Sequence, residues 1–186
     1  MNKSVDFIKG NKFSAVTLRV NTKKVNKYDI RKFFNLEFRE FRGINNNMPF
    51  FEKDKKSDGF HIFWLTEVET AMLYNILETL VRKILVSKEE LEAIFEDIII
   101  WKKDIIFEKW TMAFVGMNLI HTNSNNSNMG KESKTLNISF NFSKKNDKYS
   151  LKWLKLSSTQ KNKKLETMLN KQDIFVLINF FSNAYR

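Results

Sequence analysis

The sequence predicts an α+β protein in which two antiparallel β-rich halves, residues 1–86 and 98–186, are each followed by an amphipathic helix. The halves repeat the same order of elements, as pseudo-repeats would, and they are expected to pack as a single domain over residues 1–186. Several segments alternate apolar and polar residues with the period of a strand. Two segments repeat apolar residues at helical spacing behind a capping signal. The composition, 42% hydrophobic and 14% aromatic over 186 residues, is sufficient for a core.

Alternation predicts the strands of the first half. Residues 13–20 place apolar and polar side chains on opposite sides, and residues 35–42 repeat the pattern less regularly. The segment 28–34 between them fits either a helical turn or a strand. Residues 43–49 contain three asparagines and the only proline, which predicts a loop. The aromatic run over residues 60–65 predicts a short strand.

Capping signals predict where the helices begin. In a capping box, a side chain accepts the third backbone N–H of the helix while the residue at that third position reaches back to the cap. The first helix is expected to run to about Val86 and the last to carry apolar residues from Ile174 to Tyr185. The three signals are Thr66 with Glu69, Ser87 followed by Glu89 and Glu90, and Asn170 with Asp173.

The second half begins with one or two strands over residues 105–120. The clearest strand of the chain, residues 136–143, alternates without a break, and its partner over residues 149–156 follows a hairpin connection. Two stretches are expected to lack regular structure: the Asn/Ser-rich segment 121–134, which is too polar to order itself, and a basic linker over residues 157–164.

Charge is distributed unevenly along the chain. Residues 1–56 carry fourteen Lys and Arg against six Asp and Glu, residues 57–130 carry six against eleven, and residues 131–171 carry eleven against three. Two basic blocks around an acidic one favour a polyanionic partner, provided that folding joins the basic blocks into one surface. The alternative is that these charges only solvate the surface. Lys outnumbers Arg by 26 to 6, which favours phosphate contacts over the reading of base edges.

No constellation for catalysis or for a cofactor is apparent in the sequence. The chain has no cysteine, which excludes disulfides and thiolate metal sites, and His61 and His121 stand apart from any ligand cluster. No glycine-rich phosphate loop and no nucleophile motif is present. The tripeptide Glu132-Ser133-Lys134 has a form found in metal-dependent nucleases, but no partner acid is identifiable. We therefore expect no catalytic residue, no metal ligand and no cofactor.

The expected compartment is intracellular, either cytoplasmic or nucleoid-associated. The first residues lead into no apolar run of the kind that a signal peptide has. The longest apolar candidate, residues 98–106, is interrupted by three charged residues and is shorter than the ~18 residues that a membrane span needs. No membrane partner is expected.

The hairpin over residues 136–156 is the first candidate surface for nucleic acid. Lysines neutralise phosphates, and an aromatic ring on an open sheet offers a stacking platform worth ~1–3 kcal/mol per base. Simple alternation places Tyr149, Leu151 and Trp153 on the same side of the strand, and it leaves open whether these rings are exposed or part of the core. The candidates are Lys144, Lys145, Lys148, Lys152, Lys155, Tyr149 and Trp153.

A second candidate surface combines basic and aromatic residues of the first half. Phe50 and Phe51 follow the predicted loop and have no evident place in a core, so partial exposure is expected. Basic residues lie on both sides of them in the sequence. The candidates in this group are Arg39, Arg42, Lys53, Lys55, Lys56, Phe50 and Phe51.

The order of these elements resembles that of the Whirly and PUR-repeat families of single-strand binding proteins. The resemblance covers most of the chain as a pattern, strands followed by a helix and then repeated, with basic strand regions and an acidic helical region. It includes no signature motif, and the predicted basic linker departs from it. In those families the sheet holds the nucleic acid, while the helices form the core or the subunit contacts.

The function that these patterns favour is non-catalytic binding of nucleic acid, with single-stranded DNA or RNA preferred and little sequence preference. One alternative is a protein-interaction module that forms a homo-oligomer through its apolar helix faces. Another alternative is a metal-dependent nuclease. The patterns do not distinguish DNA from RNA.

Overall fold

A computed structural model of the chain describes residues 6–10, 14–24, 26–28, 30–96, 102–111, 114–124 and 133–184. The first half contains β1 (Asp6–Gly10), β2 (Ser14–Lys24), β3 (Ile30–Asn45), β4 (Met48–Phe51), β5 (Phe60–Thr66) and α1 (Glu67–Arg82), and it is followed by β6 (Val86–Ser87) and α2 (Lys88–Glu96). The second half contains β7 (Lys102–Thr111), β8 (Phe114–Ser124), β9 (Ser133–Lys145), β10 (Lys148–Gln160), β11 (Lys163–Leu169) and α3 (Lys171–Ala184).

The described strands form two antiparallel sheets. In the first sheet the order is β1-β2-β3, and the far edge of β3 pairs with β5 over residues 33–39 and with β4 over residues 41–45. In the second sheet the order is β11-β10-β9-β8-β7, with the short β6 beside the start of β10. The predicted α+β class, with antiparallel β-rich halves that end in helices, is confirmed.

The two halves share an order of elements. Four neighbouring antiparallel strands, β1-β2-β3-β5, lead into α1, and four others, β8-β9-β10-β11, lead into α3. The inserted β4 and the additional β7 distinguish them. Whether this shared order reflects a duplicated unit stays a prediction.

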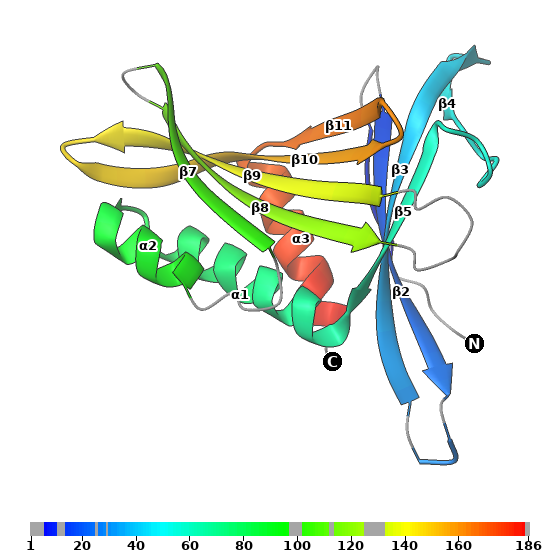
Figure 1. Ribbon diagram of the computed structural model, residues 1–186, viewed down its shortest axis with the longest axis horizontal. Helices are drawn as coiled ribbons and strands as arrows, with labels where there is room; N and C mark the ends of the chain where they lie inside the picture. The colour runs from blue at the N-terminus through cyan, green and yellow to red at the C-terminus, as the bar shows by residue number, and fades with distance from the viewer. Residues whose placement is uncertain are drawn as a thin grey trace.

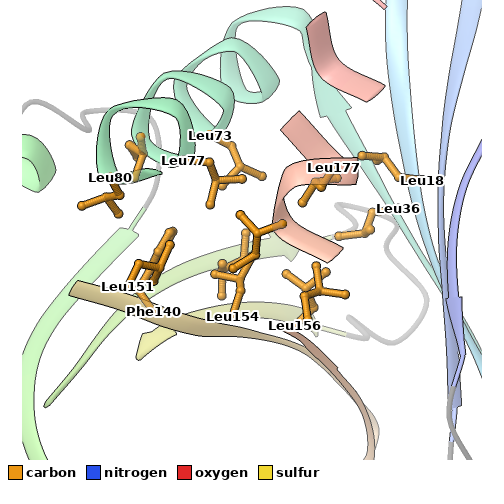
Figure 2. Close-up of a cluster of buried hydrophobic side chains, with 14 of the residues drawn as sticks. Leu18, Leu36, Leu73, Leu77, Leu80, Phe140, Leu151, Leu154, Leu156 and Leu177 are labelled. Carbon is orange, nitrogen blue, oxygen red and sulfur yellow. The ribbon is translucent and has the colours of Figure 1, made fainter. Parts of the chain in front are cut away.

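The helices lie on one side of each sheet, so that both sheets turn their inner faces toward a common core (Figure 1). Figure 2 shows leucines from α1 and α3 between leucines of both sheets. This burial of apolar area is the dominant favourable contribution to folding. The central leucines are Leu18, Leu36, Leu73, Leu77, Leu154, Leu156 and Leu177.

Polar side chains join the two sheets where β11 contacts β2. The Ser14 hydroxyl hydrogen-bonds to the Glu166 carbonyl and lies 3.0 Å from the Thr167 hydroxyl. Nearby, the buried His61 ring on β5 is 2.6 Å from the Ser158 hydroxyl on β10. These groups are sealed from water, and each is hydrogen-bonded, which is the condition for burying them at little cost.

The predicted helix starts are confirmed. Thr66 and Glu69 bond reciprocally at the start of α1, and Asn170 and Asp173 do the same at α3. At α2, Ser87 completes its box with Glu90. The first helix ends at Arg82, four residues before the predicted end, because the chain turns there into β6.

Two predicted irregular stretches are hairpins instead. Residues 43–49 belong to β3 and β4, which are joined through Asn46 and Asn47 at φ of 50° and 61°. Asparagine tolerates this left-handed conformation, and a two-residue turn of this type matches the twist of a hairpin. The predicted linker 157–164 contains the end of β10, a turn at Lys161 with φ 47°, and the start of β11.

Other predictions of local structure have different outcomes. The undecided segment 28–34 becomes strand from Ile30 onward. The polar segment 121–134 is only partly irregular, since β8 continues to Ser124 and β9 begins at Ser133. Residues 125–132, which include Glu132 of the nuclease-like tripeptide, lie outside the described residues, as do residues 97–101.

Candidate nucleic-acid interface

A β-bulge in β10 decides which aromatic side chain of the late hairpin faces outward. The pairing with β9 shifts between Leu151 and Trp153, so Lys152 is the extra residue. Leu151 pairs with Phe142, which faces the core, whereas Trp153 pairs with Asn141 on the opposite face. Simple alternation placed Leu151 and Trp153 on one side, and this prediction is wrong because a bulge reverses the side on which the following residues point.

Tyr149 is part of the core. It precedes the bulge, is 6% exposed and packs with the buried side chains of the inner face. Its ring therefore has no free face for a base, and the stacking role predicted for it is corrected. Trp153 is half-buried on the outer face of the second sheet. Of the two rings, only Trp153 lies where a ligand on that face can reach it.

The lysines of the late hairpin fall into two groups. Lys144 is 3.1 Å from Asp147, and the hydrogen bond between them raises the pKa of the lysine. Lys155 is 3.8 Å from Glu166 on the neighbouring strand. Lys145, Lys148 and Lys152 are exposed and make no ion pair with any described residue. The second group is available for phosphate.

In the first half, the two arginines are held by carboxylates. Arg39 is 2.7 Å from Glu37 and lies over the Phe60 ring at 5.2 Å. Arg42 contacts both Glu40 and Glu52. Their charges are therefore largely compensated within the protein, and a ligand phosphate would have to compete with these pairs.

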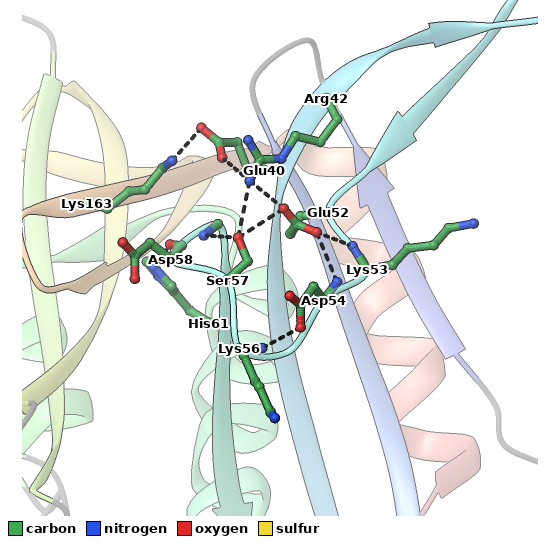
Figure 3. Close-up of polar contacts among 11 residues, drawn as sticks. Glu40, Arg42, Glu52, Lys53, Asp54, Lys56, Ser57, Asp58, His61 and Lys163 are labelled. Atoms are coloured by element: carbon green, nitrogen blue, oxygen red, sulfur yellow. Dashed lines mark hydrogen bonds and ion pairs between the residues drawn. The ribbon is translucent and has the colours of Figure 1, made fainter.

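Glu52 organises the loop that carries the three early lysines (Figure 3). Its carboxylate accepts bonds from the backbone N–H groups of Lys53 and Asp54, from the Ser57 hydroxyl and from Arg42. The bond from the Asp54 N–H is the largest cause that lowers the Glu52 pKa to about 2. The side-chain ammonium groups of the exposed Lys53, Lys55 and Lys56 make no ion pair with any described residue.

The predicted aromatic pair beside this loop is only partly accessible. Phe50 is 43% exposed and covers Gly43, while Phe51 is half-buried edge-on against Phe41 at 6.0 Å. Partial exposure is confirmed for both rings. Phe50 has the larger free surface.

The structure does not join the two predicted groups. The turn between β9 and β10 lies at one end of the second sheet, and the loop after β4 lies beyond the opposite end (Figure 1). The early loop instead adjoins the turn between β10 and β11, where Lys161 is 3.4 Å from Asp58 and Lys163 is 2.7 Å from Glu40. The expectation of a single surface from these two groups is therefore corrected to two separate basic regions.

One accessible aromatic residue was missed by the sequence reasoning. Trp64 on β5 is 55% exposed on the outer face of the first sheet, since its neighbours Phe63 and Leu65 face the core. It lies opposite Asn35 of β3, which in turn lies opposite Arg19 of β2. The alternation over residues 60–65 contained the signal, because burial of Phe63 and Leu65 requires Trp64 to point outward.

The outer faces of the two sheets share one local arrangement. Each tryptophan lies opposite an asparagine, Trp64 opposite Asn35 and Trp153 opposite Asn141. The side-chain oxygens of both asparagines are buried and have no hydrogen-bond partner. A buried acceptor without a donor is costly, and this cost lies directly beside each outward-facing tryptophan.

No metal site accompanies these faces. Among the described residues, no group of three or more His, Asp or Glu is placed to hold an ion. Both ring nitrogens of His61 have partners, the Ser158 hydroxyl and the Asp58 carbonyl, which is 2.9 Å from Nε2. Burial lowers the pKa of His61.

Within the same described part of the chain, no helix is both long and apolar enough to cross a bilayer.

The chain matches no protein-family model, no curated protein and no solved structure. The resemblance to the Whirly and PUR-repeat families therefore stays a prediction.

Proposed function

We propose that this protein binds single-stranded nucleic acid, with little sequence preference, on the outer face of its first sheet. The observation that carries the proposal is Trp64, which is 55% exposed on a sheet face that none of the described helices covers. A ring in this position offers a stacking surface to any base, because every base has a π-face. The second sheet offers a related surface around Trp153.

Charge supports a polyanionic ligand for this face. The net charge is +11, and the uncompensated lysines Lys53, Lys55 and Lys56 lie on the loop that leads directly into β5. A strand laid along β5 would pass from these lysines to Trp64. Phosphate contacts from lysine carry no sequence information, which accounts for the expected low sequence preference.

Oligonucleotide binding at two ionic strengths tests the proposal. Affinity is expected to fall steeply between about 50 and 200 mM salt, because bound phosphates release counterions. Trp64→Ala should weaken binding by roughly 1–3 kcal/mol, the value of one stacked base, and Trp64→Phe should retain most of the affinity. Tyr28→Ala is the matched control, since Tyr28 is an exposed aromatic residue in the turn between β2 and β3. Equal affinity of Trp64→Ala and the unaltered protein would contradict the assignment.

A second candidate function, self-association or protein binding, is favoured by apolar residues that the helical region leaves exposed. Ile84 and Leu85 follow α1, and Phe175 and Val176 lie on α3. An oligomer formed through them would be insensitive to salt, since burial of apolar area drives it. Sedimentation of the protein alone at two salt concentrations separates this function from nucleic-acid binding.

A further inference from the structure

The hairpin of β3 and β4 forms an arm, residues 41–51, that extends past the rest of the first sheet. Strand β3 pairs with β5 only as far as Arg39, and from Phe41 onward its partner on that edge is β4. Figure 1 shows the arm leaving the body of the molecule at the upper right. It is a continuation of the strand that carries Asn35 on the proposed binding face.

The arm is stiffened along its length. The Phe50 ring covers Gly43, where a Cβ would lie 3.0 Å from the ring, and the backbone of Gly43 has a φ of 145° that favours glycine. At the base, Arg42 is tied to Glu52 and to Ser57. Figure 3 shows this polar network beside Lys163 of the second sheet. The base of the arm is therefore tied to the loop after β4 and, through Glu40, to Lys163 of β11.

Apolar side chains are concentrated at the end of the arm. Ile44 is 70% exposed and Met48 is 68% exposed, and the exposed Pro49 lies opposite Ile44. The register places Ile44 and Pro49 on one face of the ribbon and Met48, opposite Asn45, on the other. Exposed apolar groups on both faces of a projecting end are unfavourable in water and indicate an interaction site. Asn46 and Asn47 form the turn between them, and Asn45 is the last residue of β3.

We infer that the arm is a wedge that enters the junction between single-stranded and double-stranded nucleic acid and unstacks the terminal base pair. The inference rests on the proposed function and specifies its substrate, a strand that continues into a duplex. A two-stranded ribbon fits a major groove about 12 Å wide. Ile, Met, Pro and Phe are side chains that insert between base steps, and lysines at the base of the arm would hold the flanking phosphates.

The polar turn favours nucleic acid over a lipid surface as the occupant. In a membrane, the amides of Asn45 to Asn47 would enter the hydrocarbon first and lose their hydrogen bonds to water. Against a duplex, the same amides can donate to and accept from base edges, for which asparagine is a favoured partner. The apolar residues behind them would then contact the exposed base step.

The fluorescence of a forked duplex with 2-aminopurine in the base pair next to the junction tests this inference. The fluorescence of 2-aminopurine rises when this base unstacks. The unaltered protein is expected to raise the signal. The double variant Ile44→Asn with Met48→Asn should lose most of that rise and still bind a single-stranded oligonucleotide like the unaltered protein. Ile84→Asn is the matched control, since Ile84 is an apolar residue outside the arm that is 80% exposed. Thermal unfolding of each variant checks that it folds.

Four outcomes would overturn the inference. If the unaltered protein binds the fork and the probe does not respond, or if the double variant unstacks like the unaltered protein, the wedge is refuted and the proposed function is untouched. If the unaltered protein binds neither single strand nor fork, both proposals are refuted together. Binding to phosphatidylserine vesicles that the double variant abolishes would assign the tip to a lipid surface.

Discussion

Single side chains set the local chemistry of the loop between β4 and β5. Glu52 accepts four hydrogen bonds there, two from backbone N–H groups and two from side chains. The loop presents the uncompensated Lys53, Lys55 and Lys56 while the acidic group at its centre is turned inward to the backbone. The Glu52 carboxylate thus fixes the conformation of the loop that presents these three lysines.

Glu52→Gln should therefore destabilise the protein at neutral pH and have a smaller effect in acid. The folded-state pKa of Glu52 is lowered from 4.5 to about 2, so its contribution to stability is present above pH 4.5 and is lost as the pH falls toward 2. Urea unfolding at pH 7 and pH 3 measures the difference. Glu89→Gln, on the exposed face of α2, is the control. A Glu52→Gln effect that is the same at both pH values would contradict the assignment.

His61 is predicted to make the free energy of unfolding depend on pH below about 6.5, a higher range than the one in which Glu52 acts. In the folded state, desolvation lowers the pKa of His61 below its ordinary value of 6.5. The imidazole therefore binds a proton more readily in the unfolded chain. Stability should therefore be complete above pH 6.5 and fall as the pH drops below it. In His61→Gln this dependence should flatten, and the loss of hydrogen bonds should cost on the order of 1–3 kcal/mol at pH 8. Unfolding of both proteins from pH 5 to pH 8 checks the prediction.

At the scale of elements, two deviations from regular strand structure define the candidate surfaces. The bulge at Lys152 turns Trp153 to the outer face after Leu151 has faced inward. The pairing of β3 with β4 also shifts, between Phe41 and Gly43, where the arm begins. Bulges bend a strand and re-aim its side chains, so the outward position of Trp153 and the start of the arm both follow an interruption of regular pairing.

Gly43→Ala should destabilise the arm, and the effect should remain local. The φ of 145° is unfavourable for any residue with a Cβ, and the added carbon would meet the Phe50 ring at 3.0 Å. We expect a loss of roughly 1–3 kcal/mol. Amide hydrogen exchange should accelerate in β4 and change little in β9. Uniform acceleration in both strands would show that the arm is not an independent feature.

On the scale of the whole molecule, one core serves both sheets. Leu177 of α3 is buried between Leu18 and Leu36 of the first sheet and Leu156 of the second. The apolar inner face of each sheet is buried by α1 and α3, and the same two helices also bury the inner face of the other sheet. The two halves are therefore expected to fold as one cooperative unit.

Leu177→Ala tests this dependence. The substitution should cost about 2–5 kcal/mol, the usual range for a leucine removed from a packed core. Single-tryptophan variants that retain Trp64 or Trp153 report on the first and second sheets respectively. Their denaturant transitions should coincide with each other and move together in Leu177→Ala. Two separate transitions would show that the halves are independent domains.

Much of the architecture was predictable because it depends on local patterns. The strand over residues 136–143 and all three capping signals follow from alternation and from pairs three residues apart, and these interactions are set by neighbours in the chain. The hairpins at residues 43–49 and 157–164 were predicted as loop and linker because Asn-rich and Lys-rich turns are polar, whether or not strands flank them. The bulge at Lys152 was not predictable, because the alternation of residue types along the strand does not show that one residue is unpaired.

The sequence by itself determined the fold class, the starts of the helices and the net positive charge. Only the tertiary structure decided that Tyr149 is buried, that Trp64 and Trp153 face outward, and that the basic groups occupy two regions. The physical reason is that exposure and proximity arise from contacts between distant residues, such as His61 with Ser158. Periodicity along the chain describes one strand at a time and does not specify which surfaces of two sheets will meet.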